Sequence, residues 1–115
     1  MADDVVYVDF ADGLKRMMNN AKLYVKLLAK FRDGTGIGAL EAAFGEGNLE
    51  KTQSEVHTLK GLAANLSLAA LAEQCLSLET EAKNGKLSRP KLETVKAVFD
   101  ATMREIDRIV TENGQ

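Results

Sequence analysis

Residues 49–83 read LEKTQSEVHTLKGLAANLSLAALAEQCLSLETEAK, and this stretch decides the fold. It is rich in Ala, Leu, Lys and Glu, which are strong helix formers. Ser67 stands near its middle and is a residue type that caps helices. The stretch therefore predicts one helix over 49–66 and a second over 68–83, with Ser67 breaking or kinking the chain between them and able to cap the second. A connection this short favours antiparallel packing of the two.

The flanking segments also predict helices. Upstream, Asp9 can cap a short helix over 10–18, and Asn48 can cap the helix that begins at 49. Downstream, Ser88 and Pro90 mark the start of a last helix, which runs to about 112. The remaining predicted helices cover 21–32 and 37–44, and residues 1–8 are expected to pack as an extended arm. The predicted fold is all-α, an up-and-down antiparallel four-helix bundle with an additional short N-terminal helix, in a single domain over 1–115.

Composition excludes several classes of protein. The net charge of −2, with both signs interspersed, is not typical of a nucleic-acid binder. No apolar run approaches the length of about 18 residues that a membrane span needs. The acidic stretch Met1–Asp4 lacks the basic start of a signal peptide, and the single Cys75 cannot form an internal disulfide. We expect a cytoplasmic monomer that binds neither nucleic acid nor membrane.

The helix over 49–66 has one apolar face. At about 100° per residue, five side chains fall on the side that must face the core. These are Leu49, Val56, Leu59, Ala63 and Leu66. His57, the only histidine, then points away from the core, with Lys60, Gly61 and Ala64 one or two turns further along the same side. An exposed neutral imidazole is a good nucleophile. Gly61 leaves space for a partner, and Lys60 can reach a phosphoryl group on the ring. Alternatively, His57 is an ordinary surface residue.

Other signals carry little weight. Gly34-Thr-Gly-Ile-Gly-Ala39 superficially fits a dinucleotide-binding fingerprint, but that motif needs a preceding strand and here follows a predicted helix. Cys75 fits an apolar pattern and is expected to be buried and inert. One histidine and one cysteine do not make a metal site by themselves, so the sequence predicts neither a metal nor a cofactor.

The motif His57-x-Leu-Lys-Gly61, followed by small residues and then by Cys75-x-x-Leu-Glu79, resembles the histidine-containing phosphotransfer (HPt) domain family. The resemblance covers about residues 9–85. It implies the four-helix bundle with an additional N-terminal helix. It also implies that this chain is a phosphocarrier rather than an enzyme, with His57 exchanging a phosphoryl group with the aspartyl phosphate of a response-regulator receiver domain. The Mg²⁺ and the catalytic carboxylates would belong to the receiver, and a hybrid histidine kinase is a possible further partner.

The resemblance also implies roles for other residues. Glu79 stands at a position whose polar side chain orients the histidine ring, where many members have Gln, and Lys83 falls near a position that is often basic. Receiver docking in the family is largely apolar, which makes Leu14, Met17 and Met18 of the first helix candidate contacts. Ser67 stands where the family usually has Gly. The alternative is a helical adaptor that binds receiver or kinase domains without being phosphorylated. A hydrolytic or metal-dependent enzyme would need a second cluster of titratable residues.

Overall fold

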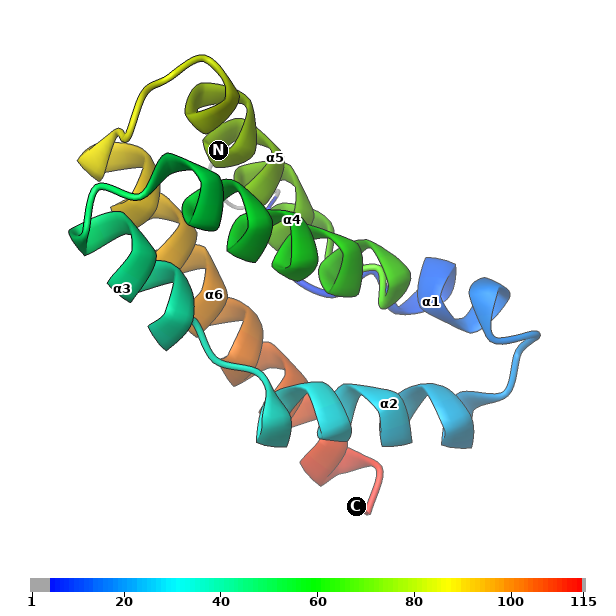
Figure 1. Cartoon of the computed structure of the whole chain (residues 1–115). Coiled ribbons are helices and arrows are strands. Elements are labelled where there is room, and N and C mark those ends of the chain that lie inside the picture. Colours follow the sequence, from blue (N-terminus) through cyan, green and yellow to red (C-terminus); the bar gives the residue numbers. More distant parts are fainter. Residues whose placement is uncertain (1–4, 115) are drawn as a thin grey trace.

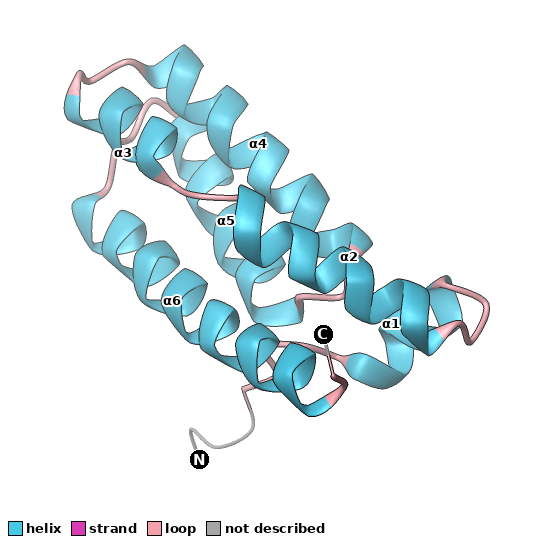
Figure 2. Ribbon diagram, turned by 90° about the horizontal axis from the view of Figure 1, so that it is seen from below, coloured by secondary structure: helices cyan, strands magenta, loops and turns pink. Residues whose placement is uncertain are grey.

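The computed structural model describes residues 5–114, and all regular structure within them is helical (Figures 1 and 2). The all-α prediction is therefore confirmed. Six helices follow one another along this part of the chain: α1 (Phe10–Arg16), α2 (Ala21–Gly34), α3 (Gly38–Gly45), α4 (Leu49–Asn65), α5 (Ala69–Lys83) and α6 (Arg89–Glu112).

The helices form a bundle whose fourth side is divided between two of them. α4, α5 and α6 pack in sequence as antiparallel neighbours (Figure 1). α2 and α3 run one after the other along α6 in the opposite direction. The Phe31 ring of α2 lies 6.3 Å from the Phe99 ring, and further along the chain Glu41 of α3 pairs with Lys96 at 2.8 Å. With α1 as the additional N-terminal helix, this is the predicted arrangement.

The core lies between the long helices. Burial of each large apolar side chain contributes roughly 1.5–3 kcal/mol, so the buried side chains together supply most of the driving force. α5 and α6 face each other through apolar side chains that are 0–1% exposed. These are Leu71, Leu78, Leu92, Val95 and Ile106.

Side-chain caps start several helices as the sequence predicts. Asp9, Asn48 and Ser88 each accept a hydrogen bond from the backbone N–H three residues further on, at 3.1, 3.0 and 3.4 Å. Each bond satisfies an N–H that has no partner within the helix. The starts of α1, α4 and α6 are thus fixed by local sequence.

Helix ends differ from the predictions by one or two residues, as is usual. α2 and α3 extend to Gly34 and Gly45. α1, predicted to reach Met18, ends at Arg16 because Met18 and Asn19 both have left-handed backbones, with φ of +55° and +63°. That left-handed turn reverses the chain into α2 and leaves Met18 in solvent.

The predicted capping role of Ser67 is wrong. Ser67 has φ of +58°, its N–H donates to the Ala64 carbonyl at 3.2 Å, and the Leu68 N–H donates to the Ala63 carbonyl at 2.9 Å. This pair of bonds is the Schellman ending of a helix, in which one residue must be left-handed. Ser67 therefore ends α4, and α5 begins at Ala69 without a side-chain cap.

The start of α5 is covered by the N-terminal arm instead. The Val6 carbonyl accepts a hydrogen bond from the Ala70 N–H at 3.0 Å, so the arm satisfies a donor of the first turn. Tyr7 and Val8 are half-buried and fit the expectation of a packed arm, whereas the side chains of Val5 and Val6 are exposed. Residues 1–4 lie outside the described part.

Candidate functional site

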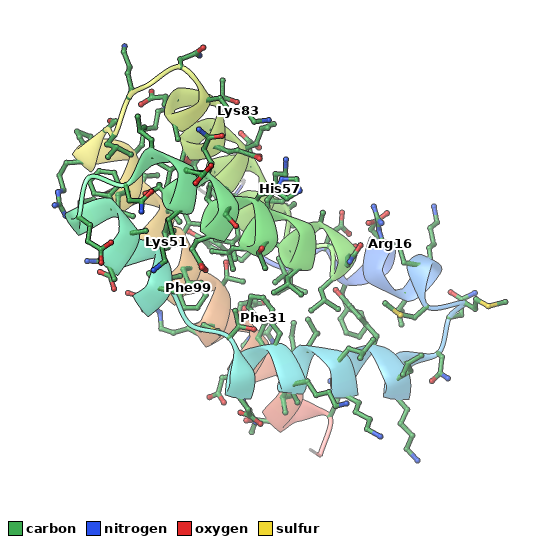
Figure 3. The ribbon with its side chains drawn as sticks, in the orientation of Figure 1. Arg16, Phe31, Lys51, His57, Lys83 and Phe99 are labelled. Atoms are coloured by element: carbon green, nitrogen blue, oxygen red, sulfur yellow. The ribbon has the colours of Figure 1, made fainter. Side chains whose placement is uncertain are left out.

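His57 projects into solvent from the middle of α4. On the opposite face Val56, Leu59 and Ala63 are buried, while Leu49 is half-buried. The imidazole is 68% exposed, and Figure 3 shows it pointing away from the bundle. The predicted exposure of His57 is confirmed.

A buried carboxylate from α5 holds the ring. Glu79 is only 3% exposed, and its Oε2 lies 2.8 Å from Nδ1 of His57. An ionised carboxylate can only accept hydrogen bonds, so Nδ1 carries the proton in the neutral ring. The lone pair then lies on Nε2, which has no hydrogen-bond partner among residues 5–114. The packing of α5 on α4 thus selects the nucleophilic nitrogen.

Two lysines flank the same carboxylate. Lys60 Nζ donates to Glu79 Oε1 at 2.6 Å, and Lys83 Nζ lies 3.7 Å from Oε2. Burial raises the pKa of Glu79, but hydrogen bonds from Lys60 and His57 outweigh it, so the pKa lies below its ordinary value. The two ammonium groups offset the negative charge of Glu79 beside the ring. Contact of Lys60 with a phosphoryl group stays a prediction, because its ammonium here lies on Glu79.

The small residues next to His57 on α4 leave open space beside the ring. A Cβ built on Gly61 would meet nothing within 4 Å, and Ala64 is exposed. On the α5 side, a shallow hollow of about 440 Å³ is lined by His57, Glu79 and Lys83 together with Gln53. Gln53, which the sequence analysis missed, donates to the Ala82 carbonyl at 3.3 Å and adds a second polar link between the two helices.

An apolar groove of about 360 Å³ lies where α1, α2 and α4 meet. Its walls include Met17, Leu27 and Leu62. Of the predicted docking residues, Met17 lines the groove, Leu14 is half-buried, and Met18 is 89% exposed. The sequence analysis missed Leu62, which is 42% exposed; the available signal was an apolar residue of α4 outside the core stripe.

The discounted signals gain no support. The glycine-rich stretch follows α2 and no strand precedes it within residues 5–114. Cys75 is buried as predicted, and burial raises the pKa of its thiol to about 12. Across residues 5–114 no three His, Cys, Asp or Glu side chains gather as a metal site would require. No helix in the same range has the length and apolar character to cross a membrane.

His57 is thus a solvent-facing histidine on an antiparallel helical bundle, and a carboxylate of the next helix holds its ring from behind. The family model described as the Hpt domain matches residues 27–109, which is most of the chain. The protein belongs to the Hpt domain family. No curated protein and no solved structure matches it.

Family membership establishes a phosphotransfer-related role in two-component signalling. Proteins of this family carry phosphoryl groups rather than act as enzymes, and they generally interact with response-regulator receiver domains.

Proposed function

We propose that this protein relays a phosphoryl group between receiver domains, or between a hybrid kinase and a regulator, through Nε2 of His57. The observation that carries the proposal is the 2.8 Å contact between Nδ1 and the buried Glu79, combined with the exposure of the ring. We further propose that residues 1–115 act as one cytoplasmic, monomeric domain, as the sequence predicts.

The transfer step uses the lone pair that the Glu79 contact assigns to Nε2. Nε2 attacks the phosphorus of the receiver's aspartyl phosphate, a P–N bond forms, and the P–O bond to the aspartate breaks with release of its carboxylate. The ring keeps the proton on Nδ1 and becomes positively charged. Glu79, which accepts that proton's hydrogen bond, offsets the new charge. Return transfer runs the same bonds backwards.

Positioning and charge compensation are the main requirements of phosphoryl transfer. The receiver supplies the metal ion and the carboxylates of the reaction. This chain supplies a fixed ring, and Lys83, whose side chain is 62% exposed and whose Nζ lies 3.7 Å from Glu79 Oε2, supplies a cation for the oxygens of the transferred group. Lys60 keeps Glu79 ionised inside the protein, so the carboxylate does not leave an uncompensated charge beside the phosphate.

The apolar groove gives the receiver a docking surface next to the nucleophile. Leu62 lies on α4 and lines the groove, and Gly61, the preceding residue, adds no side chain beside it. Burial of apolar area drives most protein association. Met17 and Leu27 extend the surface onto α1 and α2, and methionine adapts to more than one partner.

The proposal is tested by mixing the protein with receiver domains that carry labelled aspartyl phosphate. Transfer should give a label that is acid-labile and base-stable, as expected for phosphohistidine. His57→Gln should abolish the label and still bind the receiver. Binding of receivers without any label on the wild-type protein would favour the adaptor instead.

A further inference from the structure

We propose that Ser67 is a positioning residue for the docking face, because its hydroxyl latches α1 to the end of α4 through Asp12. The proposal rests on the proposed function in one respect only, because it takes the apolar groove, of which the end of α1 forms a wall, as the docking surface of the receiver. The latch itself is a property of the free protein.

Ser67 occupies a position where a side chain is unfavourable. Its φ of +58° lies in the left-handed region, which glycine adopts freely and which crowds the Cβ of other residues. The residue is also only 6% exposed, so its hydroxyl has lost most of its water. A serine at this place needs a compensating contact.

That contact is with α1. The Ser67 hydroxyl donates to Asp12 Oδ2 at 2.6 Å, across 55 positions of sequence, and the Ser67 carbonyl accepts from the Asp9 N–H at 2.9 Å. Ser67 thus holds the cap and the first turn of α1 together. Within residues 5–114, the hydroxyl–carboxylate bond is the one side-chain hydrogen bond that joins α1 to another part of the chain. It is also the main cause that lowers the pKa of Asp12.

The other contacts of α1 are apolar, because Phe10, Leu14 and Met17 are half-buried and pack against the core. α1 has seven residues, too few to be stable alone. Its apolar contact centres on Tyr24 of α2, whose ring lies 5.2 Å from Phe10 and packs so close to Gly13 that a Cβ there would overlap it. The Tyr24 hydroxyl donates to the Leu66 carbonyl at 2.6 Å, so this ring is fixed to the same corner that Ser67 occupies.

The latch bears on docking because α1 ends at the groove. Met17, the residue that closes α1, is one of the walls of the groove. If the first turn of α1 is released, the position of the whole short helix, and with it that of Met17, is less well fixed. Release of the latch should therefore weaken partner binding and leave the His57–Glu79 contact intact.

Two variants separate the contribution of the Ser67–Asp12 hydrogen bond from that of the left-handed backbone of Ser67. Ser67→Ala removes the hydroxyl and keeps the crowded Cβ, whereas Ser67→Gly removes both. The glycine variant should therefore melt several degrees above the alanine variant. In both, the Asp9 amide should exchange its hydrogen about tenfold faster than in the wild type. Both should also bind a phosphorylated receiver several-fold more weakly.

A control preserves the latch. Arg16→Gln removes the other partner of Asp12, an exposed ion pair at 3.0 Å, and should leave the exchange of the Asp9 amide unchanged. The proposal is overturned if Ser67→Gly keeps wild-type exchange at Asp9, or if its receiver affinity equals that of the wild type. A wild-type protein that takes no label from any receiver would contradict the proposed function, whereas the exchange measurement would still decide the latch.

Discussion

The two sides of α4 differ in chemistry. Toward α5 lies an ionic cluster around the buried Glu79, which binds both His57 and Lys60. Toward α1 and α2 lies the apolar groove, whose walls include Leu62 and Met17. The first side fixes the proton of the neutral ring on Nδ1 of His57, and the second leaves Leu62 42% exposed. Because the ionic cluster and the apolar groove share none of these residues, substitutions should alter the transfer rate and the affinity for a partner separately.

The largest expected effect on transfer comes from a substitution of Gly61, on the surface between the ionic cluster and the apolar groove. Gly61→Gln should slow transfer about a hundredfold or more, because a long side chain beside the ring displaces the incoming receiver. The fold should persist, since a Cβ at this position meets nothing and glutamine favours helix by roughly 0.5–1 kcal/mol over glycine. Rapid-quench transfer kinetics and thermal unfolding measure the two effects.

The matched control at the same position is Gly61→Ala, which adds only a methyl group and should retain most of the transfer rate. A Gln variant that transfers like the wild type would remove the argument that access requires glycine.

A change on the ionic side should act on the reaction rate. In Glu79→Gln an amide NH₂ group replaces one of the two carboxylate oxygens, so the separate oxygens that accept from Lys60 and from Nδ1 of His57 are no longer both available. We expect transfer at saturating receiver to slow about tenfold, in line with the loss of a charge-assisted hydrogen bond, and receiver affinity to change little. An unchanged rate at saturation would show that the charge of Glu79 is dispensable.

The same variant tests the pKa of Glu79. Its folded pKa lies below the ordinary 4.5, so the unfolded state takes up the proton first. The stabilisation from this carboxylate is therefore fully present above about pH 4.5 and is lost as the pH falls through the folded value. Urea unfolding should show the wild type losing its advantage over Glu79→Gln below pH 4.5, and an advantage that grows in acid would contradict the assignment.

A change on the apolar side should act on affinity. Leu62→Asp places a charge where the receiver would bury it, and we expect binding to weaken about tenfold, or roughly 1.4 kcal/mol. The rate at saturating receiver should stay near that of the wild type. Val5→Asp is the control, because Val5 is 48% exposed but lies on the N-terminal arm. Equal losses in the two variants would mean that the groove is not the docking surface.

The smallest expected effect comes from a residue that belongs to neither the ionic cluster nor the apolar groove. Thr52 is fully buried, and its hydroxyl finds no partner among the described residues. Thr52→Val keeps the shape and removes the unpaired group, so it should raise the free energy of unfolding by about 1 kcal/mol. Denaturant unfolding measures the gain, and transfer should be unchanged. A destabilised variant would show that the hydroxyl is satisfied.

Local patterns in the sequence were enough to place most of the fold. Caps such as Asp9 and Asn48 fix where helices start, and the apolar period of residues 49–66 fixes that His57 faces solvent. The approach of Glu79 to the ring depends on the packing of one helix on another, which no single-helix pattern contains. Only the family resemblance pointed to it.

Ser67 shows why one local prediction failed. Serine is a good helix cap, so its position before a helix indicated that role. The structure uses it to end α4, and its hydroxyl binds Asp12, which lies 55 positions away in the sequence. Such a contact is set by tertiary packing and leaves no periodic signal.

The most direct test locates the phosphoryl group on the ring. NMR of protein with ¹⁵N-labelled histidine, before and after transfer from a receiver, distinguishes the two ring nitrogens. In the free protein we expect the neutral ring of His57 to carry its proton on Nδ1. After transfer we expect a bond from phosphorus to Nε2. Phosphorus on Nδ1, or on any residue other than His57, would contradict the central claim that Glu79 presents Nε2 as the carrier atom.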